Sequence, residues 1–192
     1  MFGHKFRRAV RTRRQRSVLA MRQLDALSIS IGVLGGVATL MTATVLSIPV
    51  WVIFIAWASF FILGAGTDGL VRSIASNVTG IVIASLTLLV IHALGSGTTI
   101  AAVTVGVGSA AMVQASKISL LSKLPAIVWG FASTVGTVAA TGHDITTRSI
   151  SNPALVAALA MVLGAAFGIA SEYWGAAMTA RTAAEPAPEG QS

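Results

Sequence analysis

The sequence contains no cysteine in its 192 residues. Disulfides, thiol nucleophiles and cysteine-bound metals are therefore excluded. Charged residues make up only 10% of the chain, whereas a soluble domain has about a quarter. Hydrophobic residues make up 55%, and the mean hydropathy is +0.83. So few charges cannot cover a water-facing surface, and the composition predicts an all-α, polytopic membrane protein, because lipid accepts helices that are apolar all round.

Groups that carry catalysis are scarce as well. The three histidines lie far apart, and no HExxH motif occurs. No nucleophile lies beside a base, and no two carboxylates share an apolar run. The ionisable residues Asp68, His92, Asp144 and Glu172 are expected near the ends of the runs. We therefore expect neither an enzyme nor a metal site or cofactor.

Positive charge is present and gathers at the amino terminus. Eight of the thirteen lysines and arginines fall in the first 22 residues, among them Arg7, Arg8, Arg11, Arg13, Arg14 and Arg16. Phe2, Phe6 and Val10 recur there at roughly helical spacing. Residues 1–24 are therefore either a basic helix on anionic lipid headgroups or a solvated arm that fixes topology. No recognition module follows the arm, so nucleic acid is not expected as a partner.

Six apolar runs follow the arm, at residues 26–50, 51–66, 78–94, 98–115, 124–140 and 153–170. A membrane-spanning helix needs about 20 residues, so the runs predict six transmembrane helices. The domain boundaries that follow are 1–24 for the arm, 25–97 and 98–175 for two groups of three spans, and 176–192 for the tail. The tail is rich in Ala, Pro and Glu and is expected to be disordered.

Loop charge predicts the orientation in the membrane. With the amino terminus in the cytoplasm, the arm, Arg72, Lys117, Lys123 and Arg181 all stay inside. Only Arg148 is then exported. The sequence therefore predicts that both termini are cytoplasmic (N-in/C-in).

Two short phrases predict an internal repeat. "RSIASN" begins at Arg72 and "RSISN" at Arg148, and Ala58-Ser59 pairs with Ala132-Ser133 at a similar spacing along the chain. Because each unit has an odd number of spans, the second unit is inverted in the membrane relative to the first. Such 3+3 inverted repeats are typical of channels and secondary transporters, which have the solute path at the repeat interface.

Neutral polar residues within the runs predict the path. The candidates that line it are Ser59, Asn77, Thr79, Ser133, Thr137 and Asn152, with the two asparagines expected at helix starts. Aromatic residues that can form a constriction are Trp57, Phe60, Phe61, Trp129 and Phe131. A possible gate is the pair His143 and Asp144, near Arg148, because histidine titrates near neutral pH.

The runs lack central charges, which ion-coupled carriers generally need. We therefore expect a channel or facilitator for a small uncharged polar solute, such as urea, an amide, an alcohol or ammonia. The alternatives are an ion-coupled secondary transporter, and a structural or regulatory protein that docks a partner through the basic arm. Membrane lipids are expected partners, and compact six-span channels commonly form homo-oligomers.

The stretch from Pro49 through Gly80 resembles a family of small bacterial inner-membrane proteins, the domain of unknown function 1097. Its clearest elements are Pro49-Val50-Trp51, Trp57, Gly66, Gly69, and Ser76-Asn77 followed by Gly80. The likeness covers roughly residues 27–174. It implies six spans and a bacterial cytoplasmic membrane location, and it implies little chemistry. The long basic arm departs from the short amino termini of that family.

Overall fold

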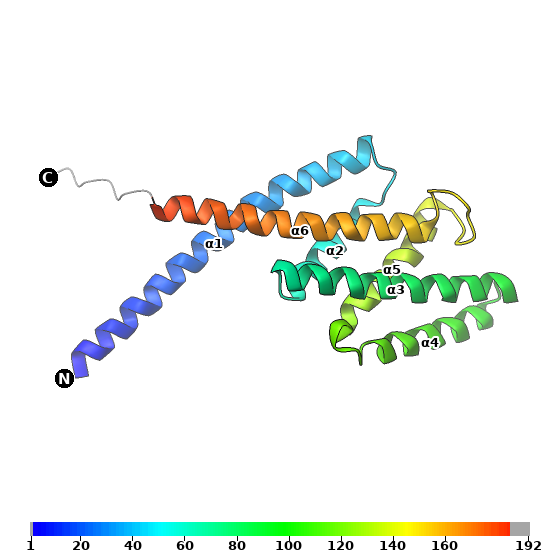
Figure 1. Cartoon of the computed structure of the whole chain (residues 1–192), viewed down its shortest axis with the longest axis horizontal. Coiled ribbons are helices and arrows are strands. Elements are labelled where there is room, and N and C mark those ends of the chain that lie inside the picture. Colours follow the sequence, from blue (N-terminus) through cyan, green and yellow to red (C-terminus); the bar gives the residue numbers. More distant parts are fainter. Residues whose placement is uncertain (1, 185–192) are drawn as a thin grey trace. The chain divides into compact units, whose positions relative to one another are not determined.

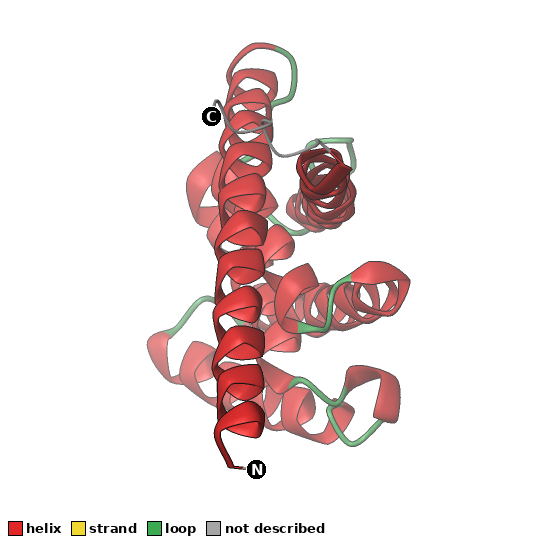
Figure 2. Ribbon diagram, turned by 90° about the vertical axis from the view of Figure 1, so that its left-hand side faces the viewer, coloured by secondary structure: helices red, strands yellow, loops and turns green. Residues whose placement is uncertain are grey.

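A computed structural model describes residues 2–184, with side chains for 23–180. Within that range the chain is helical and contains no strand (Figures 1 and 2). The elements are α1 (Phe2–Thr44), α2 (Val50–Ile62), α3 (Gly66–Leu94), α4 (Thr98–Ala115), the short 3₁₀ helix η1 (Ser119–Leu121), α5 (Leu124–Thr141) and α6 (Pro153–Ala184).

Five stretches of these helices are long and apolar enough to cross a membrane: Gln23–Thr44, Gly66–Leu94, Thr98–Ala115, Leu124–Thr141 and Pro153–Ala180. Their outward faces carry large apolar side chains, such as Val82, Leu86, Val103, Val107 and Val162, that water would not stabilise. The protein is therefore embedded in a membrane. The helix α2, at 13 residues, is the short one.

The expected bounds are wrong at two places. The third helix begins at Gly66 rather than at residue 78, so Asn77 lies well inside α3 and does not begin a helix. The last helix continues to Ala184, past residue 175, so Glu172 lies within α6. Residues 185–192 lie outside the described part of the chain, and so do the side chains of the arm arginines Arg7, Arg8, Arg11, Arg13, Arg14 and Arg16.

The turn between α2 and α3 holds a backbone conformation that favours glycine. Gly64, Ala65 and Gly66 all have positive φ, at 114°, 57° and 60°. Ala65 combines this φ with a ψ of −172°, a region that is essentially restricted to glycine. The turn reverses the chain so that α3 can begin at once.

We expect Ala65→Gly to stabilise the protein by about 1 kcal/mol. The substitution relieves the backbone strain of the folded state, and this gain exceeds the cost of the greater conformational entropy that glycine gives the unfolded chain. Gly64→Ala is the control and is expected to destabilise, since it places a Cβ atom at a positive φ of 114°. Unfolding in mixed detergent measures both changes. Equal effects of the two substitutions would contradict the prediction.

The chain divides into two compact units, Met1–Gly36 with Ala170–Ser192, and Val37–Ile169. In the first unit α1 packs against the end of α6. The Ser30 hydroxyl donates a hydrogen bond to the Ser171 carbonyl at 3.1 Å, and Gly175 lies against Leu27. The second unit contains α2 to α5, the end of α1 and the start of α6.

In the second unit α3 crosses α5 at a backbone contact. A Cβ atom on Gly80 would overlap the Ile127 carbonyl oxygen, and one on Gly130 would overlap the Asn77 carbonyl oxygen. Only glycine allows two helix backbones to approach so closely. The crossing fixes the position of Asn77 against α5.

A second crossing joins α2 to α6 in the same way. A Cβ atom on Gly164 would overlap the Ile53 carbonyl oxygen, and one on Gly168 would lie 2.6 Å from the Phe60 ring. Ala160, one turn earlier, is fully buried. The small residues that recur every four positions on α6 therefore form its packing face.

Each buried residue of α2 can be paired with a buried residue of α5, and the number of residues between the two members is the same for every pair. The pairs are Val52 and Ala126, Ile53 and Ile127, Ala56 and Gly130, Trp57 and Phe131, Ser59 and Ser133, and Phe60 and Thr134. Every buried residue of α2 has a buried partner in this alignment, which we call the short register. Ala38 of α1 and Met112 of α4 are also buried, and they form a pair in the same register.

The buried positions of α3 recur in α6 at a constant but longer spacing, which we call the long register. The pairs are Gly69 and Pro153, Ser73 and Ala157, Ser76 and Ala160, Asn77 and Met161, Gly80 and Gly164, Ile81 and Ala165, Ala84 and Gly168, and Thr87 and Ser171. The two "RSI" phrases are therefore not equivalent. Arg72 lies within α3, whereas Arg148 lies in the long connection between α5 and α6.

Candidate functional site

A cluster of neutral polar side chains lies at the centre of the second unit. The Ser73 hydroxyl of α3 donates to the Ser59 hydroxyl of α2 at 2.9 Å. The Asn77 amide, one turn further along α3, donates to both hydroxyl oxygens at 3.2 Å. All three side chains are fully buried. These hydrogen bonds therefore join α2 to α3 without any charged group.

Three buried polar atoms in this region have no hydrogen-bond partner within the described protein: Ser76 Oγ, Asn77 Oδ1 and Ser133 Oγ. Two other buried hydroxyls, those of Thr134 and Thr137, donate to carbonyl oxygens of their own helix, α5. A buried polar atom without a partner costs about 1–3 kcal/mol. Such atoms mark a place where a water or a polar solute would be stabilised.

The close crossing of α3 and α5 explains why the cluster is tightly enclosed. Gly130 brings α5 against the Asn77 backbone, and Ser133 follows one turn later on the same face. Ser59, Ser73, Ser76, Asn77 and Ser133 each have zero exposure. The arrangement is closed to solvent, and none of its side chains can carry a charge. We call these five residues the polar cluster.

The positions of α6 that match those of α3 in the long register are apolar. In the long register, Ser73, Ser76 and Asn77 of α3 correspond to Ala157, Ala160 and Met161, and all six residues are buried. The α2–α6 crossing therefore packs like the α3–α5 crossing, without polar groups. Polarity is not required for the packing itself.

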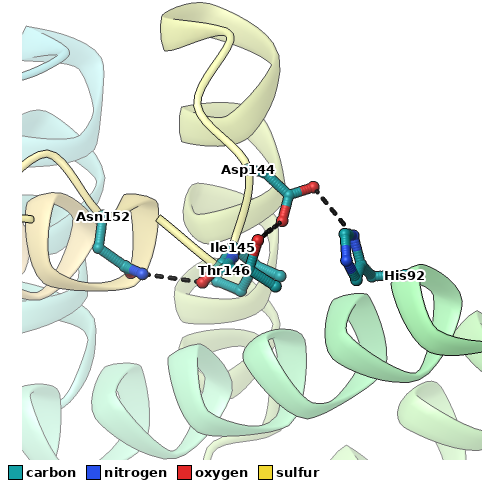
Figure 3. Close-up of polar contacts among 5 residues, drawn as sticks. All are labelled: His92, Asp144, Ile145, Thr146 and Asn152. Atoms are coloured by element: carbon teal, nitrogen blue, oxygen red, sulfur yellow. Dashed lines mark hydrogen bonds and ion pairs between the residues drawn. The ribbon is translucent and has the colours of Figure 1, made fainter. Parts of the chain in front are cut away.

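Three of the six candidate path residues, Thr79, Thr137 and Asn152, are not part of the polar cluster. The Thr79 hydroxyl donates to the Ala75 carbonyl of its own helix at 2.8 Å. Asn152 begins α6, as expected: its Oδ1 accepts a hydrogen bond from the Ala154 amide at 2.9 Å. Its Nδ2 donates to the Ile145 carbonyl at 2.8 Å (Figure 3). The same Nδ2 donates to the Thr147 carbonyl at 2.8 Å, and the two bonds fix the preceding loop.

The candidate constriction residues are divided between two places. Trp57 and Phe60 of α2 face α6, where the Trp57 ring stacks on Phe167 with a centroid distance of 5.6 Å. Phe131 of α5 packs instead beside α4, against Met112. Phe61 and Trp129 are half-buried. The described positions of these rings do not form one ring around a path.

Asp144 pairs with His92 of α3 rather than with its neighbour His143. The distance from His92 Nδ1 to Asp144 Oδ2 is 3.5 Å (Figure 3). Asp144 Oδ1 accepts hydrogen bonds from the Thr146 hydroxyl at 2.6 Å and the Thr146 amide at 2.8 Å. These bonds, with a smaller contribution from His92, lower the pKa of Asp144 below its usual value of 3.8. Sequence reasoning missed this pair, because its partners lie far apart along the chain.

The lowered pKa predicts a small pH dependence of stability. The stabilisation from ionised Asp144 is present above about pH 4 and is lost as the pH falls through the lower folded-state pKa. The melting temperatures of the wild type and of Asp144→Asn are therefore expected to converge below pH 4. Both side chains of the pair are more than half exposed, so the difference at neutral pH is small. A difference that grew on acidification would contradict the prediction.

The sequence matches a known protein family. The family described as "Protein of unknown function (DUF1097)" matches residues 28–176. The chain belongs to the DUF1097 family. The match includes α2 to α5 with the whole polar cluster, while the basic arm lies before it. No curated protein and no solved structure matches this DUF1097 protein.

Proposed function

We propose that this DUF1097 protein is a 3+3 inverted repeat with both termini in the cytoplasm, and that it passes a small uncharged polar solute through the polar cluster. Urea, amides, alcohols and ammonia are the solute types that the cluster suits. The observation that carries the proposal is the set of three buried, unpartnered polar atoms, Ser76 Oγ, Asn77 Oδ1 and Ser133 Oγ.

The two crossings support the repeat. If the first three helices correspond to the last three, the α3–α5 crossing is the counterpart of the α6–α2 crossing. Gly80 meets the carbonyl oxygen of Ile127, and Gly164 meets that of Ile53. The two isoleucines form a pair in the short register, and the two glycines form a pair in the long register. The residues that make the second spacing longer lie in the connection between α5 and α6.

The directions of the helices support the inversion. Within the Val37–Ile169 unit, α3 and the start of α6 run in opposite directions (Figure 1). The start of α3 lies beside η1, where Arg72 donates to the Ser119 carbonyl at 3.1 Å. The end of α3 lies beside the loop after α5, where His92 meets Asp144. The basic residues Arg72, Lys117 and Lys123 thus belong to one end, which is the cytoplasmic end by the positive-inside rule.

Because the sequence contains no cysteine, the orientation can be tested without background labelling. Ser149→Cys in the α5–α6 connection should react with a membrane-impermeant maleimide in intact cells. Ser122→Cys, beside η1, should react only after the cells are permeabilised. The reverse pattern would contradict the N-in/C-in orientation.

The solute path is tested in proteoliposomes by stopped-flow light scattering. We expect uptake of urea, acetamide, glycerol or ammonia to exceed that of protein-free vesicles for at least one of them. Uptake should not change when a proton or sodium gradient is imposed, because the polar cluster holds no titratable group. Uptake that follows the gradient would favour a coupled transporter, and no uptake of any of them would refute the path.

A further inference from the structure

Positive charge gathers in the Val37–Ile169 unit where α3 begins and where η1 joins α4 to α5. Between residues 23 and 180, where side chains are described, the sequence has four lysines and arginines, and three of them lie here: Arg72, Lys117 and Lys123. We call these three residues the basic cluster. The Asp68 carboxylate, one turn before Arg72 on α3, offsets only one of the three charges. The cluster therefore keeps a net positive charge.

The segment that carries the two lysines is held in one position against α3. The Leu121 side chain of η1 is buried in the core with Met112 and Phe131. The Arg72 guanidinium donates from Nη1 to the Ser119 carbonyl at 3.1 Å. This bond uses one of its N–H donors and leaves further donors for an anionic ligand. Both lysines are exposed, so their ammonium groups are accessible as well.

The lengths of the helices place the basic cluster at the surface of the hydrocarbon layer. The helices α4 and α5 have 18 residues each, which rise about 27 Å, close to the hydrocarbon thickness of about 30 Å. The segment that joins them therefore lies at the boundary between hydrocarbon and headgroups. The helix α3 is longer, at 29 residues or about 43 Å, so its first turns extend into the headgroups too.

Two large apolar side chains lie beside the cations and face outward. Ile118 is 56% exposed and Leu120 is 40% exposed. At the edge of the hydrocarbon layer such side chains are stabilised by acyl chains, while neighbouring lysines reach the headgroups. A dissolved anion would contact the cations and leave the two apolar side chains in water. A phospholipid has groups that match both.

We propose that the basic cluster binds an anionic phospholipid. The phosphate lies among the three cations, where the guanidinium can donate two parallel hydrogen bonds and the lysines act as point charges. The acyl chains lie against Ile118 and Leu120. This inference requires neither the inverted repeat nor the solute path, and it does not depend on which side of the membrane the cluster faces.

A fluorophore on Ser122→Cys reports on the lipids at the cluster, since the sequence contains no other cysteine. The full-length protein is reconstituted in vesicles of phosphatidylcholine and phosphatidylglycerol, with a nitroxide on the acyl chain of one lipid or of the other. The ratio of the two quenching strengths measures the preference for the anionic lipid. We expect a ratio well above one. A fluorophore on Ser96→Cys, at the other end of α3, should give a ratio close to one.

Two variants remove the cations, and the basic arm is unchanged in both. Arg72→Gln keeps a donor for the Ser119 carbonyl, and the second variant combines Lys117→Gln with Lys123→Gln. Each should lower the ratio at position 122 towards one, by up to about fivefold for each charge removed. Arg148→Gln is the matched control. It removes the fourth cation, in the α5–α6 connection, and should leave the ratio unchanged.

Asp68→Asn tests the same charge balance in the opposite direction and should raise the ratio. If Arg72→Gln prevents folding, the double lysine variant keeps the test decisive, because both lysines are exposed. A wild-type ratio of one at position 122 would overturn the proposal, and so would an equal loss in Arg148→Gln, which would assign the preference to overall charge. No solute flux enters these measurements, so the lipid site and the solute path can fail separately.

Discussion

Gly130→Ala is expected to destabilise the protein by about 3 kcal/mol or more, at the upper end of the usual overpacking range. The added methyl group would overlap the Asn77 carbonyl oxygen. Because the obstacle is a backbone atom, no side-chain rotation relieves the overlap, and α3 and α5 must move apart. Unfolding in mixed detergent, followed by tryptophan fluorescence, measures the loss.

Gly106→Ala is the matched control for this change. Gly106 lies in α4, and a Cβ atom there would meet nothing within 4 Å. The same substitution should therefore be neutral or slightly stabilising, since alanine favours helix by about 1 kcal/mol over glycine. If the two variants unfold together, the close α3–α5 crossing is wrong.

The triple variant Ser73→Ala, Ser76→Ala and Asn77→Met is expected to reduce solute flux to that of protein-free vesicles. It gives α3 the side chains that α6 has at the positions paired with them in the long register, Ala157, Ala160 and Met161. These side chains already pack against a neighbouring helix in this fold, so the variant should remain folded. Two buried atoms without partners disappear, Ser76 Oγ and Asn77 Oδ1. Ser59 Oγ loses both of its hydrogen-bond donors at the same time, so the free energy of unfolding should change little.

The control for the triple variant is Ser85→Ala on the same helix. The Ser85 hydroxyl donates to the Ile81 carbonyl of α3, at 2.7 Å, and the residue is half-buried outside the polar cluster. Its flux should equal that of the wild type. Wild-type flux in the triple variant would show that the polar cluster does not form the solute path.

Hydropathy alone predicted the helices well, because lipid selects long apolar runs whatever their neighbours. It placed the start of α3 at residue 78 rather than at Gly66, since the first turns of this helix include Asp68, Arg72, Ser73 and Asn77. Ser73 and Asn77 are buried, and both donate hydrogen bonds to Ser59 of another helix. The local sequence around a residue does not reveal a hydrogen-bond partner on another helix. The Gly64-Ala65-Gly66 turn was the signal that could have placed the start correctly.

The repeat stays a prediction, and the structure treats its two sequence matches differently. Ala58-Ser59 and Ala132-Ser133 do share the short register, and Ser59 and Ser133 lie on the packing faces of α2 and α5. The "RSI" phrases do not match in this way: Arg72 lies within α3, whereas Arg148 lies in the α5–α6 connection, and the buried positions of α3 and α6 match in the long register instead. Small apolar residues are so frequent in this sequence that matching residue types cannot distinguish the two registers. The pattern of buried residues in the structure does distinguish them.

Asn152 was predicted correctly as a helix cap, since an asparagine followed by proline is a local signal. Ser59, Asn77 and Ser133 were predicted as polar residues of the path, and they lie around the α2–α3–α5 contact. Ser73 and Ser76 were missed because they were assigned to a loop. The pairing of His92 with Asp144 depends on tertiary structure and has no sequence signal.

The shortness of α2 has a consequence for the membrane around it. Its 13 residues rise about 20 Å along a helix, whereas the hydrocarbon layer is about 30 Å thick. If α2 crosses the membrane, headgroups and water reach inward at one or both of its ends, or the bilayer thins beside it. Since Ser59 lies near the end of α2, a molecule that crosses along this helix would leave bulk water for only about two-thirds of the usual distance.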